Sequence, residues 1–294
     1  EGPYAEDLRP GVQGLGGLRP FGSDIGEEVC SGGLSGNRKM VEAERRAFAD
    51  RSEYPGDPGF VKIPVDQLVN KKYLLDRMST YNENRASTSL EISPGSPGGY
   101  ISEETTHYSV VDASGNAVAA TTTLNNTFGN SIVADSAGFL LNNQMDDFSV
   151  KPGFPNMYGL VGGEANSIQP GKRMLSSMTP VIVEKDGNLF LVAGSPGGST
   201  IPTTVFQVIV NVIDFGMDLI QAVDAGRFHH QWLPDWISYE KNAIDSLTYE
   251  KLNDMGHILK ERSSIGSVNA IMILPGGKKA GGPDKRGNNS SCGY

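Results

Sequence analysis

The composition of the chain changes abruptly after residue 104, and this change constrains the fold more than any other feature of the sequence. Residues 79–104 are rich in Ser, Thr, Asn, Pro and Gly, a composition that is typical of a flexible, exposed linker. Two β-rich runs follow at once, at 106–112 and 116–124, and the turn Ala-Ser-Gly between them indicates a hairpin. We therefore expect a boundary between two regions of the chain at residue 104.

Upstream of this point the sequence predicts little regular structure. Residues 1–39 are rich in glycine and show no sustained period of 2 or 3.6 residues, so we expect an irregular segment of unknown role. Residues 40–104 form a second region, which ends in the linker. Within it, a helix is predicted over 40–49, stopped by Tyr-Pro-Gly-Asp-Pro at 54–58, and another over 66–78.

Downstream, residues 105–294 are predicted to form one region of hairpins followed by helices. A second pair of strands is expected at 179–184 and 189–193, around the turn 185–188. Helices are expected at 203–215, 217–225 and 247–255. Because no regular β-α-β alternation is visible, the pattern favours an α+β fold with helices packed on antiparallel sheet over a doubly wound fold.

Composition excludes several classes of function. The formal net charge of −9 makes a nucleic-acid partner improbable, because phosphate binding requires clustered Lys and Arg. No apolar run approaches the length of about 20 residues that a membrane span needs. The start of the chain shows no charged-then-apolar leader, so we expect that any export signal was removed or never present. The two cysteines, Cys30 and Cys292, provide neither a disulfide framework nor metal-ligand spacing.

Polar residues cluster at five places, each of which also has a plain structural explanation. The clusters are Glu-Glu-Thr-Thr-His-Tyr-Ser at 103–109, Thr-Thr-Thr-Leu-Asn-Asn-Thr at 121–127, Leu-Leu-Asn-Asn-Gln-Met-Asp-Asp-Phe at 140–148, Leu-Ser-Ser-Met at 175–178 and Gly-Ser-Pro-Gly-Gly-Ser at 194–199. Strand propensity and turns account for most of these residues. The last cluster joins a strand to a helix, and such a turn points backbone N–H groups at a common spot, which suits an anion or an oxyanion.

These clusters belong to longer runs that resemble a known family. The runs are Thr-Thr-His-Tyr-Ser-Val-Val-Asp at 105–112, Leu-Leu-Asn-Asn-Gln-Met-Asp-Asp-Phe-Ser at 140–149, Met-Leu-Ser-Ser-Met at 174–178, Gly-Ser-Pro-Gly-Gly at 194–198 and Arg-Phe-His-His-Gln-Trp-Leu-Pro at 227–234. In this order they resemble the small subunit of γ-glutamyltransferases, which has Pro where Met174 stands here. Ala-Asp-Arg at 49–51 and Gly-Asp-Pro at 56–58 resemble the end of the family's large subunit.

The resemblance implies both a fold and an activity. The fold is the four-layer αββα sandwich of N-terminal-nucleophile hydrolases, expected to be incomplete because most of the large subunit has no counterpart here. The activity is self-cleavage, followed by transfer of a γ-glutamyl group from glutathione or a related compound to water or to an amino-acid or peptide acceptor. The family needs no metal or organic cofactor, its two fragments stay associated, and its members are typically periplasmic or extracellular.

The resemblance also implies roles for individual residues. Cleavage after Glu104 would expose Thr105 as the nucleophile, and its own α-amine, with a pKa of about 7.7–8.0, is a suitable general base near neutral pH. By matching positions, Thr123 would orient the nucleophile, Asn125, Gln144 and Asp147 would hold the substrate's α-amino end, Ser176 and Ser177 would bind its α-carboxylate, Gly197 and Gly198 would form the oxyanion hole, and Tyr158 would close a lid. The family's large subunit further supplies an arginine for the α-carboxylate, and no residue here matches it by motif.

Three other interpretations remain open from the sequence. A serine hydrolase would use Ser195, Asp224 and His257, in the order that such enzymes use. A metal site could use His229, His230 and His257, although adjacent histidines in a strand point to opposite faces. A truncated relative could keep the β core yet neither cleave itself nor turn over substrate.

Overall fold

The structure of the chain, a computed structural model, describes residues 34–92 and 105–293. Its helices are α1 (Leu34–Glu53), α2 (Val65–Leu68), α3 (Lys71–Met78), α4 (Ile201–Ile213), α5 (Leu219–Asp224) and α6 (Ser246–Asp254), and its 3₁₀ turns include η3 (Gln144–Asp147), η4 (Glu164–Asn166) and η5 (Gly198–Thr200). Its strands are β1 (Thr106–Val111), β2 (Ala117–Thr122), β3 (Val133–Ala134), β4 (Phe139–Leu140), β5 (Val181–Lys185), β6 (Asn188–Gly194), β7 (Phe228–His229), β8 (Ile237–Glu240), β9 (Leu259–Arg262), β10 (Asn269–Ile273) and β11 (Lys279–Pro283).

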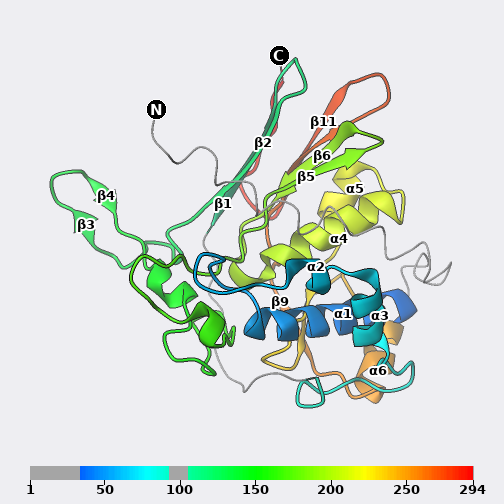
Figure 1. Cartoon of the computed structure of the whole chain (residues 1–294). Coiled ribbons are helices and arrows are strands. Elements are labelled where there is room, and N and C mark those ends of the chain that lie inside the picture. The colour runs from blue at the N-terminus through cyan, green and yellow to red at the C-terminus, as the bar shows by residue number, and fades with distance from the viewer. Residues whose placement is uncertain (1–33, 93–104, 294) are drawn as a thin grey trace.

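A four-stranded antiparallel sheet of order β11-β10-β6-β5 forms the centre of the larger layer system. On strand β6, Leu191 and Ala193 pack against α4 and α5. The opposite face of the strand, at Gly194, lies against His107 of the β1–β2 hairpin. This division follows from the alternation of side chains along a strand. The hairpin contacts β10 and β6, so helices, sheet and hairpin form three successive layers, which Figure 1 shows as nearly parallel bands.

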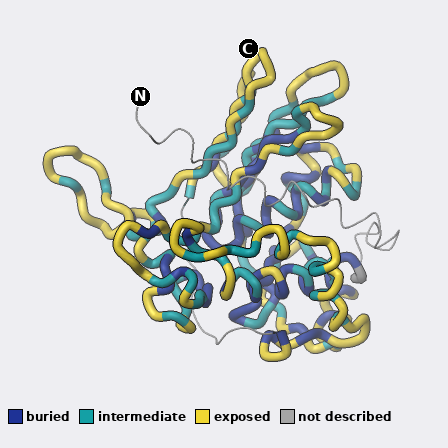
Figure 2. The backbone as a smooth tube through the Cα atoms, in the orientation of Figure 1, coloured by how far each residue is buried: buried dark blue, intermediate teal, exposed yellow. Residues whose placement is uncertain are grey.

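A second, smaller sheet of order β7-β8-β9 supports the helix α1. Strands β8 and β9 are parallel and α6 connects them, so the chain contains one β-α-β unit that the sequence did not predict. The core of this part contains Val41 of α1 together with Ile237 and Leu252. In Figure 2 much of the α1 helix is coloured as buried.

The first helix starts earlier in the chain than predicted. Helix α1 begins at Leu34 rather than at Met40, and it continues to Glu53. Tertiary contacts extend it: Arg38 is buried, its Nη2 donates to the carbonyl oxygen of Asn82 at 2.7 Å, and its guanidinium lies 5.5 Å from the centre of the Tyr81 ring. Residues 1–33, including Cys30, and residues 93–104 of the predicted linker lie outside the described residues, and Cys292 is an exposed free thiol.

The single helix predicted over 66–78 is wrong, because the structure has two helices there. Helix α2 ends at Leu68, and the side chain of Asn70 then accepts hydrogen bonds from the backbone N–H groups of Lys72 and Tyr73. This cap starts α3 as a new helix. The predicted strand pairs are confirmed as β1–β2 and β5–β6, and the three downstream helices are confirmed as α4, α5 and α6.

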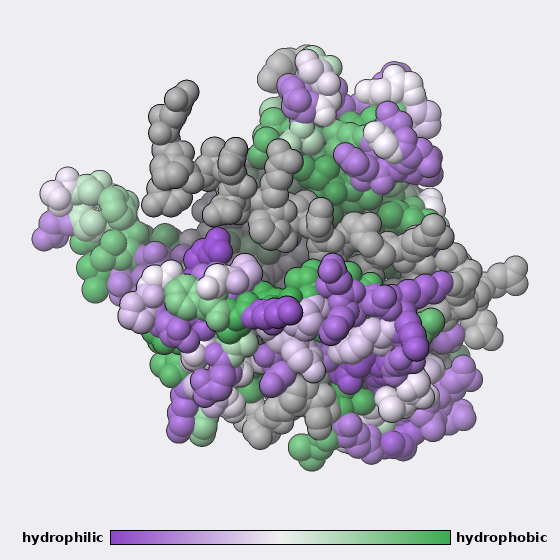
Figure 3. All heavy atoms as spheres, viewed as in Figure 1, coloured by the Kyte–Doolittle hydropathy of each residue, from purple (hydrophilic) through white to green (hydrophobic). Residues whose placement is uncertain are grey.

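A two-stranded arm, β3–β4, projects from the body of the molecule (Figure 1). It exposes large apolar side chains, with Val133 at 51% and Phe139 at 57% of their full accessible area. Figure 3 shows this arm as a largely apolar projection on one side of the molecule.

Candidate functional site

Two threonine hydroxyls meet at the open end of the β1–β2 hairpin. Because Thr106 pairs with Thr122, the pairing brings Thr105 opposite Thr123. The Oγ1 of Thr105 donates to the Oγ1 of Thr123 at 3.3 Å, and the latter also accepts from the backbone N–H of Asn125 at 2.9 Å. The hydroxyl of Thr105 is thereby held in one orientation by the hairpin itself.

His107 fastens this hairpin to the four-stranded sheet. Its ring lies so close to Gly194 that a Cβ atom there would come within 2.3 Å of it. The ring nitrogens form hydrogen bonds with Thr121 Oγ1 at 2.8 Å and with Ser109 Oγ at 3.1 Å. Burial lowers the pKa of His107 to about 4, so the ring is neutral at physiological pH and its role is structural.

The glycine turn after β6 lies beside Thr105. Gly197 and Thr105 line the same pocket, whose volume is about 370 Å³. Gly197 has a φ of 139° and Gly198 a φ of 52°, in the region that favours glycine. A Cβ atom on Gly197 would approach Thr200 Oγ1 to 2.6 Å. The turn therefore requires glycine at position 197, and this glycine and Thr105 line a common pocket.

Asn125 and Tyr158 form the next part of the site. Asn125 is buried and has a φ of 75°, a conformation that asparagine tolerates better than most residues. The phenol of Tyr158 donates to the carbonyl oxygen of Asn125 at 2.7 Å, and Gln231 Nε2 donates to the carbonyl oxygen of Tyr158 at 2.8 Å. The segment that carries Tyr158 is thus held over Asn125 from both sides.

A second pocket, of about 230 Å³, surrounds Asp147 at the end of η3. Desolvation raises the pKa of Asp147 to about 6, the positive charge of Arg51 opposes this rise, and the neighbouring carboxylate of Asp146 adds to it. Gln144 begins the same 3₁₀ turn. The pocket is therefore suited to a cationic group, which would favour the ionised form of Asp147.

Arg51 and Ser177 meet close to this pocket. The Nη2 of Arg51, which lines the pocket with Asp147, donates to Ser177 Oγ at 2.9 Å. Ser176 is exposed, and its Oγ accepts from the backbone N–H of Met178 at 3.1 Å. The sequence motifs predict no arginine at this site. The only signal for Arg51 was its place in the Ala-Asp-Arg run, just before a helix stop.

The structure thus brings the candidate residues together in two groups. Thr105 and Gly197 line one pocket, and Asp147 and Arg51 line the other. Asn125 connects them, because its backbone N–H bonds to Thr123 and its Nδ2 donates at 3.3 Å to the carbonyl oxygen of residue 143, which precedes η3. Glu104 lies outside the described residues.

The serine-hydrolase interpretation is wrong. The Oγ of Ser195 donates to the carbonyl oxygen of Pro196 at 2.5 Å and accepts from the backbone N–H of Ser267 at 2.8 Å. His257 is buried, and the charged residues that act on it include Glu42 and Arg45 of α1. No imidazole therefore activates the hydroxyl of Ser195 within the described part of the chain.

The adjacent histidines bind protein groups. Both ring nitrogens of His229 form hydrogen bonds, to Thr203 at 2.8 Å and to Gln231 at 2.9 Å. His230 accepts from the backbone N–H of Trp232 at 3.0 Å and lies 3.4 Å from Asp235. Among residues 34–92 and 105–293, no group of three or more His, Cys, Asp or Glu side chains could hold a metal ion. The metal-site interpretation has no support here.

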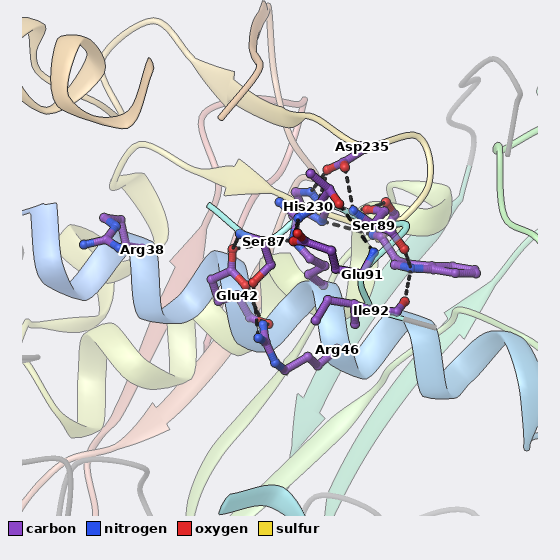
Figure 4. A network of polar contacts seen from close by, with 12 residues as sticks. Arg38, Glu42, Arg46, Ser87, Ser89, Glu91, Ile92, His230 and Asp235 are labelled. Atoms are coloured by element: carbon purple, nitrogen blue, oxygen red, sulfur yellow. Dashed lines mark hydrogen bonds and ion pairs between the residues drawn. The ribbon is translucent and has the colours of Figure 1, made fainter. Parts of the chain in front are cut away.

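A buried polar network ties the segment before residue 93 to the loop after β7 (Figure 4). Asp235 pairs with Arg45 of α1 and accepts from the backbone N–H of Ser89 at 2.7 Å. The indole of Trp232 donates to the carbonyl oxygens of Ser89 at 3.0 Å and Ile92 at 2.7 Å. These contacts join residues that lie on opposite sides of position 104.

Comparison with known proteins agrees with this geometry. The sequence matches the gamma-glutamyltranspeptidase family over residues 15–294. A glutathione hydrolase proenzyme of Escherichia coli (strain K12) is 54% identical over 247 residues, which are 84% of this chain and 42% of that protein. A counterpart from Pseudomonas aeruginosa is 48% identical over 237 residues, or 80% of this chain and 42% of that protein. The chain therefore spans less than half the length of these relatives.

Solved structures show the same relationship. The crystal structure of a mutant of Helicobacter pylori gamma-glutamyltranspeptidase matches this structure with a TM-score of 0.61 and 54% sequence identity. The match covers 62% of this chain and 100% of that chain. A cephalosporin acylase from Bacillus halodurans, at 24% identity and a TM-score of 0.73, covers 87% of this chain and shares its α+β fold. On the evidence of the sequence match and these relatives, the chain belongs to the gamma-glutamyltranspeptidase family.

Proposed function

We propose that this chain is the nucleophile-bearing part of a self-processing γ-glutamyl hydrolase or transferase that acts on glutathione and related γ-glutamyl compounds. The observation that carries the proposal is the hydrogen bond between the hydroxyls of Thr105 and Thr123, beside the glycine turn at Gly197. Membership of the family and the relatives named glutathione hydrolase proenzyme support it.

In the proposed reaction, cleavage between Glu104 and Thr105 first releases the α-amine of Thr105. This amine takes the proton from the Thr105 hydroxyl, whose oxygen attacks the γ-carbonyl of the substrate. Backbone N–H groups of Gly197 and Gly198 stabilise the oxyanion. The amine of the leaving group departs with a proton from the α-ammonium, which leaves a γ-glutamyl ester on Thr105. Water or an amino-acid or peptide amine then attacks this ester and releases the γ-glutamyl group.

The proposed substrate site recognises a free amino-acid head group. The ionised carboxylate of Asp147, with the amides of Asn125 and Gln144, is suited to the α-ammonium group, and Ser176 and Ser177 are suited to the α-carboxylate as hydroxyl donors. The raised pKa of Asp147, about 6, is consistent with a carboxylate that gains from a bound cation.

We further propose that the two fragments stay associated after cleavage. The Arg45–Asp235 pair and the Trp232 contacts to the segment 89–92 support this, because both cross the cleavage point and because Arg45 and Trp232 are buried. In the same proposal the three observed layers belong to a four-layer αββα sandwich, incomplete in this chain. A periplasmic or extracellular location is proposed from family resemblance. Within the described residues, no helix is both long and apolar enough to cross a bilayer.

The test is release of p-nitroaniline from γ-glutamyl-p-nitroanilide by the wild-type protein, by Thr105→Ala and by Thr105→Ser. The proposal requires turnover by the wild type, none by Thr105→Ala, and residual turnover by Thr105→Ser, which keeps a hydroxyl nucleophile. A folded wild-type protein that stays uncut and inactive would instead support a non-processing homologue.

A further inference from the structure

Arg51 reaches the Asp147 pocket from the other side of the proposed cleavage point. It lies in the last turn of α1, upstream of residue 104, whereas Ser177 and Asp147 lie downstream. The end of α1 is held firmly, because Phe48 packs in a buried cluster and the backbone N–H of Gly163 donates to the carbonyl oxygen of residue 52 at 2.7 Å. The backbone that carries Arg51 is therefore held by packing and by a hydrogen bond to the downstream segment.

The hydrogen bond from Arg51 determines what Ser177 can do. A guanidinium only donates, so Ser177 Oγ is the acceptor of the 2.9 Å bond. The hydroxyl hydrogen of Ser177 is then left to donate to another group, such as a substrate carboxylate. Arg51 thus sets the direction in which this serine presents its hydrogen.

The charge of Arg51 acts on Asp147 in the same pocket. Burial lowers the pKa of Arg51 to about 10, which still leaves it charged at neutral pH. The other charged residues that line the pocket are Asp146, whose carboxylate raises the pKa of Asp147, and Lys151. Arg51 is the cation that opposes the effect of burial on the pKa of Asp147.

We propose that Arg51 is a positioning residue of the Asp147 pocket: from the upstream fragment it orients Ser177 and brings a positive charge into the pocket that Asp147 lines. This inference rests on the proposed function for the identity of the ligand. It implies that the pocket is complete only while the fragment that carries α1 remains bound.

Binding of L-glutamate tests this role without requiring turnover. Calorimetric titrations between pH 5 and 8 would compare the purified wild-type protein with Arg51→Gln, Arg51→Lys and Arg85→Gln. The last is the matched control, because Arg85 is an exposed arginine of the same fragment that pairs with the exposed Glu91. Folding of each variant would be checked by its thermal unfolding.

We expect Arg51→Gln to weaken L-glutamate binding about 10-fold or more, as loss of a charge-assisted contact does. The pH at which binding is half lost should rise by about one unit, because a nearby opposite charge shifts a carboxyl pKa by about that much or more. Arg51→Lys should weaken binding yet keep this pH near the wild-type value, and Arg85→Gln should change neither.

A second comparison separates orientation from charge and remains informative if Arg51→Gln does not fold. In a Ser177→Ala background, Arg51→Lys should weaken binding by much less than in the wild type, because the two changes remove the same contact. The proposal would be overturned if Arg51→Gln left both the affinity for L-glutamate and its pH dependence unchanged. It would also be overturned if Arg51→Lys reduced the affinity as much in the Ser177→Ala background as in the wild type. A wild type that binds L-glutamate as expected but shows no turnover would count against the proposed function alone.

Discussion

The hydroxyl of Thr105 donates to the hydroxyl of Thr123 across the open end of the β1–β2 hairpin, at 3.3 Å. The two residues lie opposite each other because their neighbours Thr106 and Thr122 are paired in the strand register. A hairpin fastened to the central sheet by His107 is a rigid support for a reacting group, and rigid support is what holds a nucleophile in an attacking geometry.

Replacing Thr123 tests whether this contact orients the nucleophile. Thr123→Val keeps the shape of the side chain but removes the acceptor, and we expect kcat on a γ-glutamyl substrate to fall about 10²-fold, as small misplacements of a reacting group do. Thr123→Ser keeps the acceptor and should retain most of the activity. Equal kcat values for the two variants, measured on processed protein, would show that the hydroxyl contact has no such role.

Adding a methyl group to the glycine turn should damage catalysis selectively. Gly197→Ala would bring a Cβ atom within 2.6 Å of Thr200 Oγ1, and the turn would have to shift. We expect kcat to fall about 10²- to 10³-fold, the effect of losing an oxyanion donor. The control is Gly187→Ala in the β5–β6 turn, where φ is also positive, at 76°, but no atom lies within 4 Å of the new Cβ. The control should lose stability but not kcat, and similar kcat losses in both variants would contradict the assignment.

Buried histidines should make the protein sensitive to acid. The pKa of His257 is lowered to about 4, first by burial, and both of its ring nitrogens lack a hydrogen-bond partner in the described structure. Since the unfolded chain binds this proton near pH 6.5, the stabilising contribution of neutral His257 is present above pH 6.5 and is lost as the pH falls toward 4.

The variant His257→Leu isolates this contribution. The free energy of unfolding, measured by denaturant titration between pH 4 and 7, should depend on pH less steeply in the variant, by up to about 1.4 kcal/mol per pH unit. Glu44, whose pKa burial raises, acts in the opposite direction in both proteins and cancels in the comparison. An unchanged slope would mean that His257 does not titrate as described.

The buried indole of Trp232 should stabilise the contact between the segments before and after residue 104. Trp232 is 1% exposed, and its Nε1 donates to the carbonyl oxygens of Ser89 and Ile92. Trp232→Phe leaves these buried acceptors without their donor, and we expect the free energy of unfolding to fall by about 1–3 kcal/mol. Trp236→Phe is the control, because Trp236 is only partly buried and a phenyl ring can keep its contact with Lys260, so the free energy should change by less than about 1 kcal/mol. Equal losses of unfolding free energy in the two variants would show that the Trp232 hydrogen bonds do not stabilise this contact.

Short sequence patterns correctly predicted the hairpins and helices that form from residues close together in the chain. The hairpins β1–β2 and β5–β6 and the helices α4 to α6 follow from strand propensity, turn residues and apolar periodicity. The polar clusters of the sequence also contain Gly197 and Asp147, which line the two pockets of the candidate site.

The remaining features depend on contacts between distant residues. Helix α1 extends upstream to Leu34 because Arg38 is buried against residues more than 40 positions away, which no local pattern reveals. The parallel pair β8–β9 consists of two four-residue strands, too short for a clear period. Arg51 was missed for the same reason, since its partner Ser177 lies 126 residues further along the chain.

Intact-mass spectrometry of the purified protein, with Thr105→Ala beside the wild type, tests the central claim most directly. If Thr105 is the nucleophile of a self-processing enzyme, the wild type will yield two fragments divided between Glu104 and Thr105, and Thr105→Ala will remain a single uncut chain. A folded wild type that stays uncut, or a Thr105→Ala protein that is cut at the same bond, would contradict the claim that Thr105 performs the cleavage.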